Sequence, residues 1–302
     1  MTKLLINVLF LLFFVTAVQA QQASPAAPGL ALDGRVRTEA VKLKGKVSIY
    51  AKNLETGEAY SLNADDRVRT ASTIKLPIMV AVFALVADGK AAWTDELTLT
   101  ASNKVQGSGI LLEFGDGHKL TLRDAVNLMI VVSDNSATNM VLDSITADEV
   151  NARMDALGLK QTRSLRKIGG GGSSKAGDDP ANKGFGIGVS TPREMVSLLE
   201  KLDRGEVLSA AASKEMIDLL KRQQYRDGIG RNMLGTVIAG KPGALDRLRS
   251  EAGIIFSPRG RIAMAITIDD MPDIQWTVDN PALVLLSHLS EILVEGLGKG
   301  QN

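Results

Sequence analysis

The order of periodic segments along the chain predicts an α/β fold in which a discontinuous α/β lobe encloses a helical lobe. Strand-like alternation occurs near the N-terminus and returns only late in the chain, in the segments 47–51, 59–62, 253–256 and 261–268. Between them, from about 76 to 220, apolar residues recur at helical spacing. The boundaries that follow are 33–68 and 222–302 for the α/β lobe and 69–221 for the helical lobe.

The first 20 residues have the features of a cleavable secretory signal. Lys3 gives a positive start, 4–18 is almost wholly apolar, and Val18-Gln19-Ala20 fits the small-residue cleavage rule. The apolar run is shorter than the roughly 20 residues that a membrane span needs. We therefore expect a secreted or periplasmic protein without a stable membrane anchor, and a mobile lead-in over 21–32.

Composition excludes several classes of function. The 302 residues contain no cysteine, which rules out disulfides, thiol catalysis and Cys-ligated zinc. The 35 basic residues nearly balance the 34 acidic ones, so nothing indicates nucleic acid or an anionic membrane as a partner. The two histidines, His118 and His288, belong to no ligand or triad motif. We expect a monomer without cofactor or metal, with His118 solvated in a loop and His288 packed within the last helix.

Local signals along the chain predict the individual helices and strands. Asp33 can cap a helix that carries Val36, Ala40 and Leu43 on one face. A hairpin of 47–51 and 59–62 turns at Glu55-Thr56-Gly57-Glu58. The further predicted elements are a buried helix over 76–86, helices over 122–132, 147–157 and 192–202, a Gly-rich loop over 162–190 that is irregular from 169 to 188, a hairpin of 253–256 and 261–268, and a final helix over 281–297.

Ser72-Thr73-Ile74-Lys75 stands at the head of the buried helix. The free N–H groups and the positive end of the helix dipole favour an oxyanion there. Lys75 lies one turn on, toward the same face as Ser72, and can take its proton if burial near a second cation keeps the amine neutral. The alternative is a plain helix cap with a solvated lysine. A second Ser-x-x-Lys, Ser164-Leu165-Arg166-Lys167, leads into four glycines that cannot continue a helix.

Ser133-Asp134-Asn135 follows the apolar stretch 128–132 and therefore lies at the edge of a buried element. The hydroxyl of Ser133 can pass a proton to a leaving nitrogen, and the amide of Asn135 can bind a substrate carbonyl. In isolation, the triplet also fits an ordinary cap for a helix over 139–145.

Lys241-Pro242-Gly243 is the third motif. Lys241 can supply the cation that keeps Lys75 neutral, Gly243 permits close approach of the backbone to a ligand, and the N–H of Ala244 can complete an oxyanion hole with that of Ser72. The alternative is a simple β-turn. The segment 235–241 resembles a phosphate loop, but Pro242 replaces the residue that would hold magnesium, which disfavours nucleotide binding.

Together, in this order, the three motifs resemble those of the class A β-lactamases and their penicillin-binding relatives. The resemblance extends over nearly the whole mature length and includes Leu76-Pro77, Ala137, Asn139, Thr162-Arg163 and Thr191-Pro192. It implies the β-lactamase/transpeptidase-like fold, an antiparallel sheet flanked by helices beside an all-helical lobe, with a cleft between the lobes. It also implies an acyl-enzyme on Ser72, with a β-lactam or a peptidoglycan stem peptide as the partner.

The chain departs from this family pattern in three ways. Ile168 occupies the position of the loop glutamate that activates water for deacylation, and the loop's only carboxylates are Asp178 and Asp179, either of which is a candidate substitute. Pro242 replaces a hydroxyl that would bind the substrate carboxylate, a contact that Arg247 or Arg249 is a candidate to supply. The loop is also longer and richer in glycine.

The leading hypothesis is a secreted serine hydrolase that opens β-lactam amides through Ser72 and releases the acyl group slowly. Lys75 is the acylation base, Ser133 and Lys241 relay the proton, and the substrate contacts are Asn135, Gly243, Ala244 and Arg249. Two alternatives remain open: a D-Ala-D-Ala peptidase or transpeptidase, and a non-catalytic peptidoglycan-binding domain.

Overall fold

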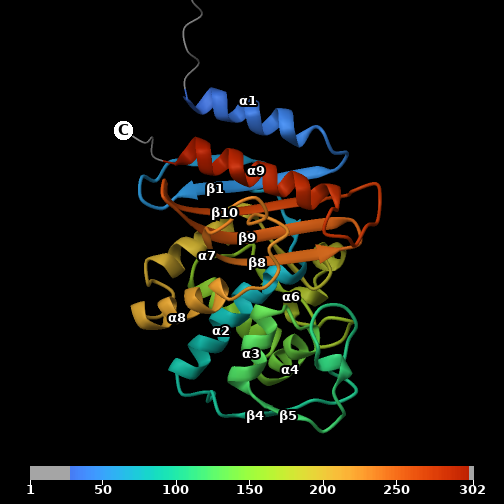
Figure 1. Cartoon of the computed structure of the whole chain (residues 1–302). Coiled ribbons are helices and arrows are strands. Elements are labelled where there is room, and N and C mark those ends of the chain that lie inside the picture. The colour runs from blue at the N-terminus through green and yellow to red at the C-terminus, as the bar shows by residue number, and fades with distance from the viewer. Residues whose placement is uncertain (1–27, 299–302) are drawn as a thin grey trace, which may run out of the picture.

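A five-stranded antiparallel sheet forms the α/β lobe of the computed structural model, which describes residues 28–298 (Figure 1). Its strand order is β2-β1-β10-β9-β8. The strands are β1 (Lys46–Asn53), β2 (Ala59–Leu62), β8 (Val237–Leu245), β9 (Leu248–Ser257) and β10 (Gly260–Asp269). Because β1 pairs with β10, the two ends of the chain meet in one sheet, and the predicted α/β fold is confirmed.

Helices α1 (Pro28–Ala40) and α9 (Pro281–Leu297) cover one face of this sheet (Figure 1). The bounds predicted for the last helix are confirmed, but the prediction that Asp33 caps α1 is wrong, because the helix already begins at Pro28. The carboxylate of Asp33 instead accepts hydrogen bonds from Arg37 Nε (2.8 Å) and the hydroxyl of Tyr60 (3.0 Å). The expected mobile lead-in therefore overlaps a helix from residue 28, while the predicted signal over 1–20 lies outside the described residues.

His288 corrects another expectation about α9. Its side chain is 46% exposed, and Nδ1 lies 3.6 Å from a carboxylate oxygen of Glu39 on α1. The prediction of a packed histidine is wrong because this face of α9 borders α1 at the surface rather than the sheet. His118 is exposed, as predicted, and its ring lies edge-on to Phe114.

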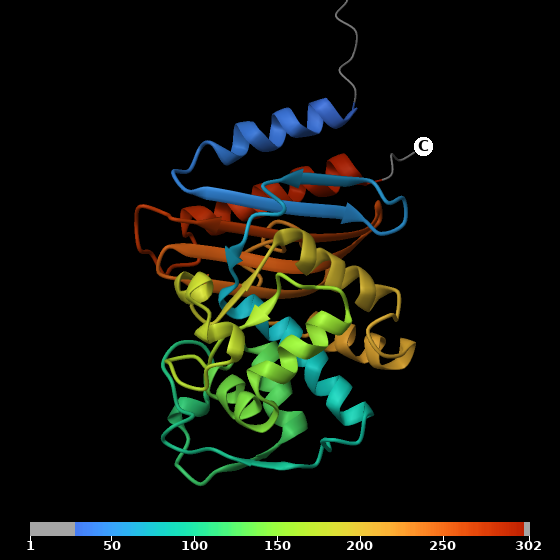
Figure 2. The same ribbon diagram turned by 180° about the vertical axis from the view of Figure 1, so that it is seen from behind.

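The opposite face of the sheet packs against α7 (Pro192–Asp203) and α8 (Ala210–Lys221), which lead into the helical lobe (Figure 2). The hydroxyl of Thr191 caps α7 by accepting from the N–H of Glu194 (3.1 Å). The other main helices of the lobe are α2 (Lys75–Ala87), α3 (Leu122–Val131), α4 (Asn135–Ile145) and α5 (Ala147–Ala156). The first ten residues of α2 are all buried, which explains why its sequence has no polar face.

Two small sheets interrupt the lobe that was expected to be all-helical. In one, β7 (Gly188–Ser190) pairs with both β3 (Val68–Arg69) and β6 (Arg163–Ser164); in the other, β4 (Glu96–Thr98) pairs with β5 (Lys119–Thr121). Strands of two or three residues are too short for alternation to reveal them. Pairing of β6 with β7 closes the neck of the Gly-rich loop, whose interior holds α6 (Lys175–Asp178) and the 3₁₀ helix η3 (Pro180–Phe185).

Two apolar clusters hold the fold together. The larger joins the helical lobe to the sheet, since it contains Met129 and Leu199 together with Ile254 and Ala263. The smaller lies between the sheet and the helices α1 and α9. Within residues 28–298, no helix combines the length and apolarity required to cross a membrane.

Candidate active site

The candidate nucleophile lies on a sharp turn at the entrance to α2. Ser72 belongs to the 3₁₀ helix η1 (Ala71–Ile74), and Ala71 before it has a left-handed backbone with φ +46°. A non-glycine residue in this region is strained and persists only where its surroundings hold it. Ala71 and Thr73 are buried, whereas Ser72 between them lines the main pocket. The turn therefore presents one hydroxyl of η1 to the cavity.

Lys75, the first residue of α2, is completely buried under the pocket. Its Nζ donates to the carbonyl oxygen of Ser133 (2.6 Å), to Asn135 Oδ1 (2.8 Å) and to Ser133 Oγ (3.1 Å). The alternative of a solvated lysine is therefore wrong. Ser133 also has a left-handed backbone, with φ +55°, at the turn that ends α3.

Lys241 contacts the Ser133 hydroxyl from the side of the sheet. It lies in β8, is completely buried, and donates from Nζ to Ser133 Oγ (2.9 Å) and to the carbonyl of Pro242 (2.9 Å). Ser133 Oγ thus lies within hydrogen-bond distance of two amines that come from opposite lobes. This arrangement is suited to passing a proton between them.

Burial determines the electrostatics of the two amines. Desolvation, and then the charge of nearby Lys241, lower the pKa of Lys75 well below its ordinary value, against a smaller opposing effect of Asp134. Desolvation also lowers the pKa of Lys241 to about 7, an effect opposed by the carboxylate of Glu251. The lowered pKa of Lys75 favours its neutral amine form, which is the form able to accept a proton.

Gly243 allows β8 to pack directly against η1. A Cβ at this residue would lie 2.8 Å from the carbonyl oxygen of Thr70 and 2.9 Å from the amide nitrogen of Ser72. This contact brings the backbone around Ala244 beside that of Ser72, as an oxyanion hole requires. The alternative of a β-turn at Lys241-Pro242-Gly243 is wrong, because the triplet lies inside a nine-residue strand.

Asp134 stabilises the local backbone, whereas Asn135 lines the pocket. The carboxylate of Asp134 caps α4 by accepting from the N–H of Ala137 (2.8 Å) and also binds the N–H groups of Ile110 (2.6 Å) and Leu111. Asn135 lines the pocket and donates from Nδ2 to the carbonyl of Gln106 (3.1 Å). The triplet therefore caps a helix and also contributes side chains to the pocket.

The pocket itself has a volume of about 400 Å³ and takes its lining from both lobes. Six of the eight predicted residues line it, and the two lysines lie buried beside Ser133. Those six are Ser72, Ser133, Asn135, Gly243, Ala244 and Arg249.

Arg249 lines the pocket with its hydrogen-bonding groups largely engaged. Its Nη1 donates to the carbonyls of Leu245 and Leu248 (both 2.7 Å), and Nη2 donates to the carbonyl of Gln275. The guanidinium also stacks on the ring of Trp276, 4.7 Å from its centroid. This geometry makes Arg249 a brace between β9 and the segment before α9.

The Gly-rich loop is attached next to α4. Asn139 donates from Nδ2 to the carbonyl of Ile168 (3.0 Å) and accepts from its N–H at Oδ1 (2.9 Å). Asp178 and Asp179 are exposed and lie outside the pocket lining; Asp178 accepts from the hydroxyl of Ser173, and Asp179 caps η3.

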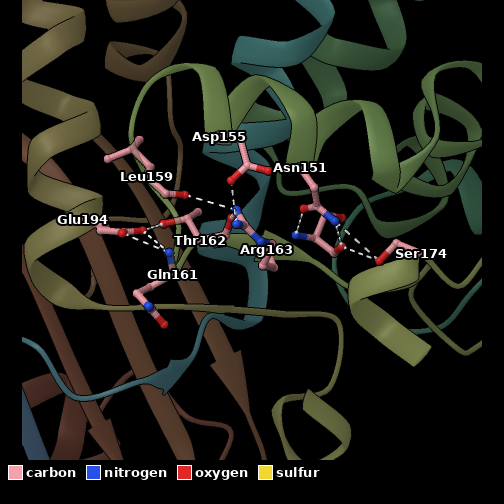
Figure 3. Close-up of polar contacts among 9 residues, drawn as sticks. Asn151, Asp155, Leu159, Gln161, Thr162, Arg163, Ser174 and Glu194 are labelled. Atoms are coloured by element: carbon pink, nitrogen blue, oxygen red, sulfur yellow. Dashed lines mark hydrogen bonds and ion pairs between the residues drawn. The ribbon is translucent and has the colours of Figure 1, made fainter. Parts of the chain in front are cut away.

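Glu194, the first glutamate after the loop, is engaged at its neck (Figure 3). It accepts from the N–H of Gln161 (2.9 Å) and from the hydroxyl of Thr162 (2.7 Å). On the other side of the neck, Arg163 forms an ion pair with Asp155 (2.7 Å). These contacts hold the loop closed at its base and leave Glu194 no role at the pocket.

Sequence reasoning missed the residues that line the far wall of the pocket and the carboxylate behind it. Tyr225, Trp276 and Val278 are exposed into or beside the cavity, and Glu251 is buried behind β8. They follow no catalytic motif. The available signal was the rarity of tryptophan, since Trp276 is one of only two in the chain.

Comparisons with known proteins agree with this fold. The sequence model of a protein family described as "Beta-lactamase enzyme family" matches residues 32–297. The β-lactamase CARB-3 of Pseudomonas aeruginosa is 24% identical over 238 residues, which cover 78% of this chain and 80% of that protein.

Two solved structures share the fold. The β-lactamase from Sphaerobacter thermophilus is 29% identical, with a TM-score of 0.77, over 88% of this chain and 96% of that one. A Leu-to-Glu variant of PBP-A, an acyl-enzyme complex with penicillin G, is 25% identical, with a TM-score of 0.74, over 90% and 98%.

Proposed function

Because the chain belongs to the β-lactamase enzyme family, we propose that it is a serine hydrolase that opens β-lactam amides through an acyl-enzyme on Ser72 and releases the acyl group slowly. The observation that carries this proposal is the position of Ser133 Oγ, which is bonded to both Lys75 and Lys241 at the edge of the pocket that Ser72 lines. A helix cap or a peptidoglycan-binding surface does not require two buried amines around one hydroxyl.

In the proposed acylation, the neutral amine of Lys75 takes the proton of Ser72 as its Oγ bonds to the amide carbonyl. The N–H groups of Ser72 and Ala244 hold the oxyanion. The proton then passes through Ser133, assisted by Lys241, to the leaving nitrogen as the carbon–nitrogen bond breaks. Asn135 contacts the substrate from the α4 side.

The proposal of slow deacylation rests on the carboxylates near the pocket. Asp178 and Asp179 lie outside its lining, Glu194 is engaged at the loop neck, and Ile168 cannot activate water. Loss of a general base slows a step by about 10²–10⁴-fold. Ile168→Glu should therefore shorten the lifetime of the acyl-enzyme, which mass spectrometry after a penicillin pulse would measure.

Fluorescent penicillin tests the nucleophile directly. Wild type should gain the mass of the intact ligand and keep it for many minutes, and Ser72→Ala should gain none. Ser164→Ala is the matched control, because Ser164 heads the second Ser-x-x-Lys and its buried Oγ has no hydrogen-bond partner among residues 28–298. Labelling of Ser72→Ala would contradict the proposal. Rapid steady-state hydrolysis would contradict slow deacylation and direct attention to Asp227, the carboxylate in the pocket lining.

A D-Ala-D-Ala peptidase or transpeptidase is the second candidate. Ile168 and the likeness to PBP-A, which is 25% identical with a TM-score of 0.76, favour it. Turnover of a stem-peptide mimic, in the absence of β-lactam labelling, would support it. Binding of peptidoglycan fragments that survives Ser72→Ala, without any covalent adduct, would support a non-catalytic domain instead.

We also propose that the protein is exported and acts as a monomer. The apolar N-terminal segment supports export, since it has the charge pattern and length of a secretory signal. N-terminal sequencing of the protein from a bacterial periplasm should begin after Ala20.

A further inference from the structure

Glu251 is a buried carboxyl group that takes no part in the acylation steps proposed above. It lies in β9 as the strand partner of Pro242, the residue next to Lys241. We propose that Glu251 is a positioning residue for acylation, which fixes the segment 223–230 to the sheet and supplies the counter-charge of Lys241. The inference rests on the acyl-enzyme chemistry proposed above.

The segment 223–230 joins the two lobes beside β8, the outer strand of the sheet. Near its start, Gln223 donates from Nε2 to the carbonyl of Ile130 in α3 (2.6 Å). Near its end, the N–H of Ile229 donates to Oε2 of Glu251 (2.9 Å). The segment therefore runs from α3, in the helical lobe, to β9, in the sheet, and Glu251 is its attachment to the strand.

The packing around the carboxyl group shows how closely the segment approaches it. A Cβ at Gly228 would lie 1.9 Å from Oε2 of Glu251, so only a glycine fits there without displacing the carboxyl group. Tyr225, Asp227 and Gly228 of the same segment line the main pocket. The bond from Ile229 to Glu251 therefore holds one wall of the pocket in place.

Glu251 and Lys241 lie on opposite faces of the sheet. Because side chains alternate along a strand, Lys241 points away from the face that carries Pro242 and its partner Glu251. Lys241 faces the helical lobe, where it bonds to Ser133. One layer of backbone thus separates the carboxyl group from the amine, and two buried charges still interact at such a separation.

The charged groups around Glu251 influence its ionisation. Burial raises the pKa of this carboxyl to about 7. The N–H of Ile229 and the positive charges of Lys241 in β8 and Arg226 in the segment oppose this rise, and the charge of Asp227 adds to it. In return, the Glu251 carboxylate raises the pKa of Lys241, which burial lowers to about 7. An ionised Glu251 therefore favours the ammonium form of Lys241.

The ammonium form of Lys241 is the one that assists the proton relay. Lys241 donates to Ser133 Oγ (2.9 Å), and a hydrogen bond from a charged donor makes that hydroxyl a better proton donor to the leaving nitrogen. Acylation should therefore decline at alkaline pH as Lys241 loses its proton. By favouring the protonated amine, Glu251 should extend acylation to higher pH.

The pH dependence of acylation by fluorescent penicillin tests the counter-charge. Glu251→Gln keeps an oxygen for the N–H of Ile229 and has nearly the shape of the protonated carboxyl, but it cannot ionise. We expect its alkaline limb to lie about half a pH unit or more below that of wild type, because the charge that favours the ammonium form is gone. A merely structural role would instead lower the rate at every pH and leave the limb in place.

Glu200→Gln is the matched control. Glu200 lies in α7, outside the pocket lining, and its side chain is only 14% exposed. Its carboxylate pairs with Lys52 (2.7 Å). The substitution therefore also removes a largely buried carboxylate, but it should leave the alkaline limb of acylation where wild type has it.

Hydrogen exchange at the Ile229 amide tests the attachment of the segment. Wild type and Glu251→Gln should both protect this N–H. Glu251→Met fills a similar volume but has no oxygen to accept the bond, so the amide should exchange about tenfold faster or more, relative to the amides of β10.

The outcomes distinguish the two proposals. An alkaline limb at the same pH in wild type and Glu251→Gln, or an equal displacement in Glu200→Gln, would overturn the inference about Glu251. So would full protection of the Ile229 amide in Glu251→Met. In each of these cases the adduct on Ser72 still forms. The absence of any adduct in wild type at every pH would instead remove the proposed acyl-enzyme chemistry, and the inference that rests on it.

Discussion

At the scale of single residues, the site depends on two lysine amines that are buried and therefore desolvated. Lys75 and Lys241 are among the largest fully buried side chains of the described chain. A buried ammonium is unfavourable unless it is paired, and within the described part of the chain no carboxylate bonds directly to either amine. Their partners are hydroxyl, amide and carbonyl oxygens. The pKa of each amine is therefore lowered, which makes a lysine usable as a base.

The charge of Lys241 should be visible in the pH dependence of acylation. Acylation is lost below the pKa of Lys75, because the ammonium form cannot take the proton of Ser72. Lys241 lowers the pKa of Lys75. Lys241→Gln should therefore move the acid limb of the acylation rate to higher pH, by about one unit. Lys241→Arg keeps the charge and is the control; a limb that moves equally in both variants would contradict this electrostatic coupling.

Glu251 should make stability depend on pH. Burial raises the pKa of this carboxyl from 4.5 to about 7. The folded state therefore holds a proton that the unfolded state has released, so this contribution to stability is complete below pH 4.5 and is lost as pH rises through 7. Relative to wild type, Glu251→Gln should gain up to about 3 kcal/mol of unfolding free energy between pH 5 and pH 8.

Urea denaturation at the two pH values measures this gain. The exposed Glu113 supplies the control, as Glu113→Gln should show no such change. A difference between Glu251→Gln and wild type that is the same at both pH values would count against the raised pKa.

The candidate site residues that belong to a catalytic sequence motif could be predicted from the sequence. Ser72, Lys75, Ser133 and Lys241 occur in recognisable triplets or quartets. The fold places Ser72 and Ser133 in one pocket, with both lysines buried beside Ser133. Glu251 and the far wall of the pocket, with Tyr225, Trp276 and Val278, could not be predicted, because their significance comes from contacts between distant segments. No local pattern indicates that a glutamate in β9 will be buried against Gly228.

At the scale of secondary-structure elements, the contact of β8 with η1 positions the oxyanion hole. Gly243→Ala should abolish or greatly slow penicillin labelling, because its Cβ would lie 2.8 Å from the Thr70 carbonyl oxygen and the two elements would have to separate. Gly184→Ala is the matched control, since a Cβ there meets no atom of residues 28–298 within 4 Å. Labelling of Gly243→Ala at the wild-type rate would contradict the need for this close approach.

Elements with clear start and stop signals were predicted well from the sequence, and those without were not. The bounds of α9 follow from Pro281 at its first position, and α7 follows Thr191-Pro192 in the same way. In contrast, β9 begins at Leu248, five residues before the predicted start at Gly253. Its first half contains Arg249, Ser250 and Glu251, which are polar but buried, and a pattern based on hydrophobicity cannot detect a buried polar strand.

At the scale of the whole molecule, the two lobes share one core. The larger apolar cluster runs from α2 and α3 through α7 and α8 to β9 and β10. The helical lobe lies below the sheet, with α7 across its face (Figures 1 and 2). Neither lobe can expose its share of this cluster without a large loss of buried apolar surface. We therefore expect the lobes to unfold together, in one cooperative transition.

Acylation should raise the temperature of that transition. The pocket is lined by residues of η1 and α4 on one side and of β8, β9 and the segment before α9 on the other, so a covalent ligand contacts both lobes of the folded state. Because such contacts exist only in the native state, they stabilise it. For a chain of this size, each kcal/mol shifts Tm by about 2–4 °C, and we expect a rise of about 5 °C after saturation with penicillin. Differential scanning calorimetry measures this rise, with Ser72→Ala plus penicillin as the control that should not move. Two separate transitions, of which only one shifts on acylation, would mean that the lobes fold independently and that the shared core does not couple them.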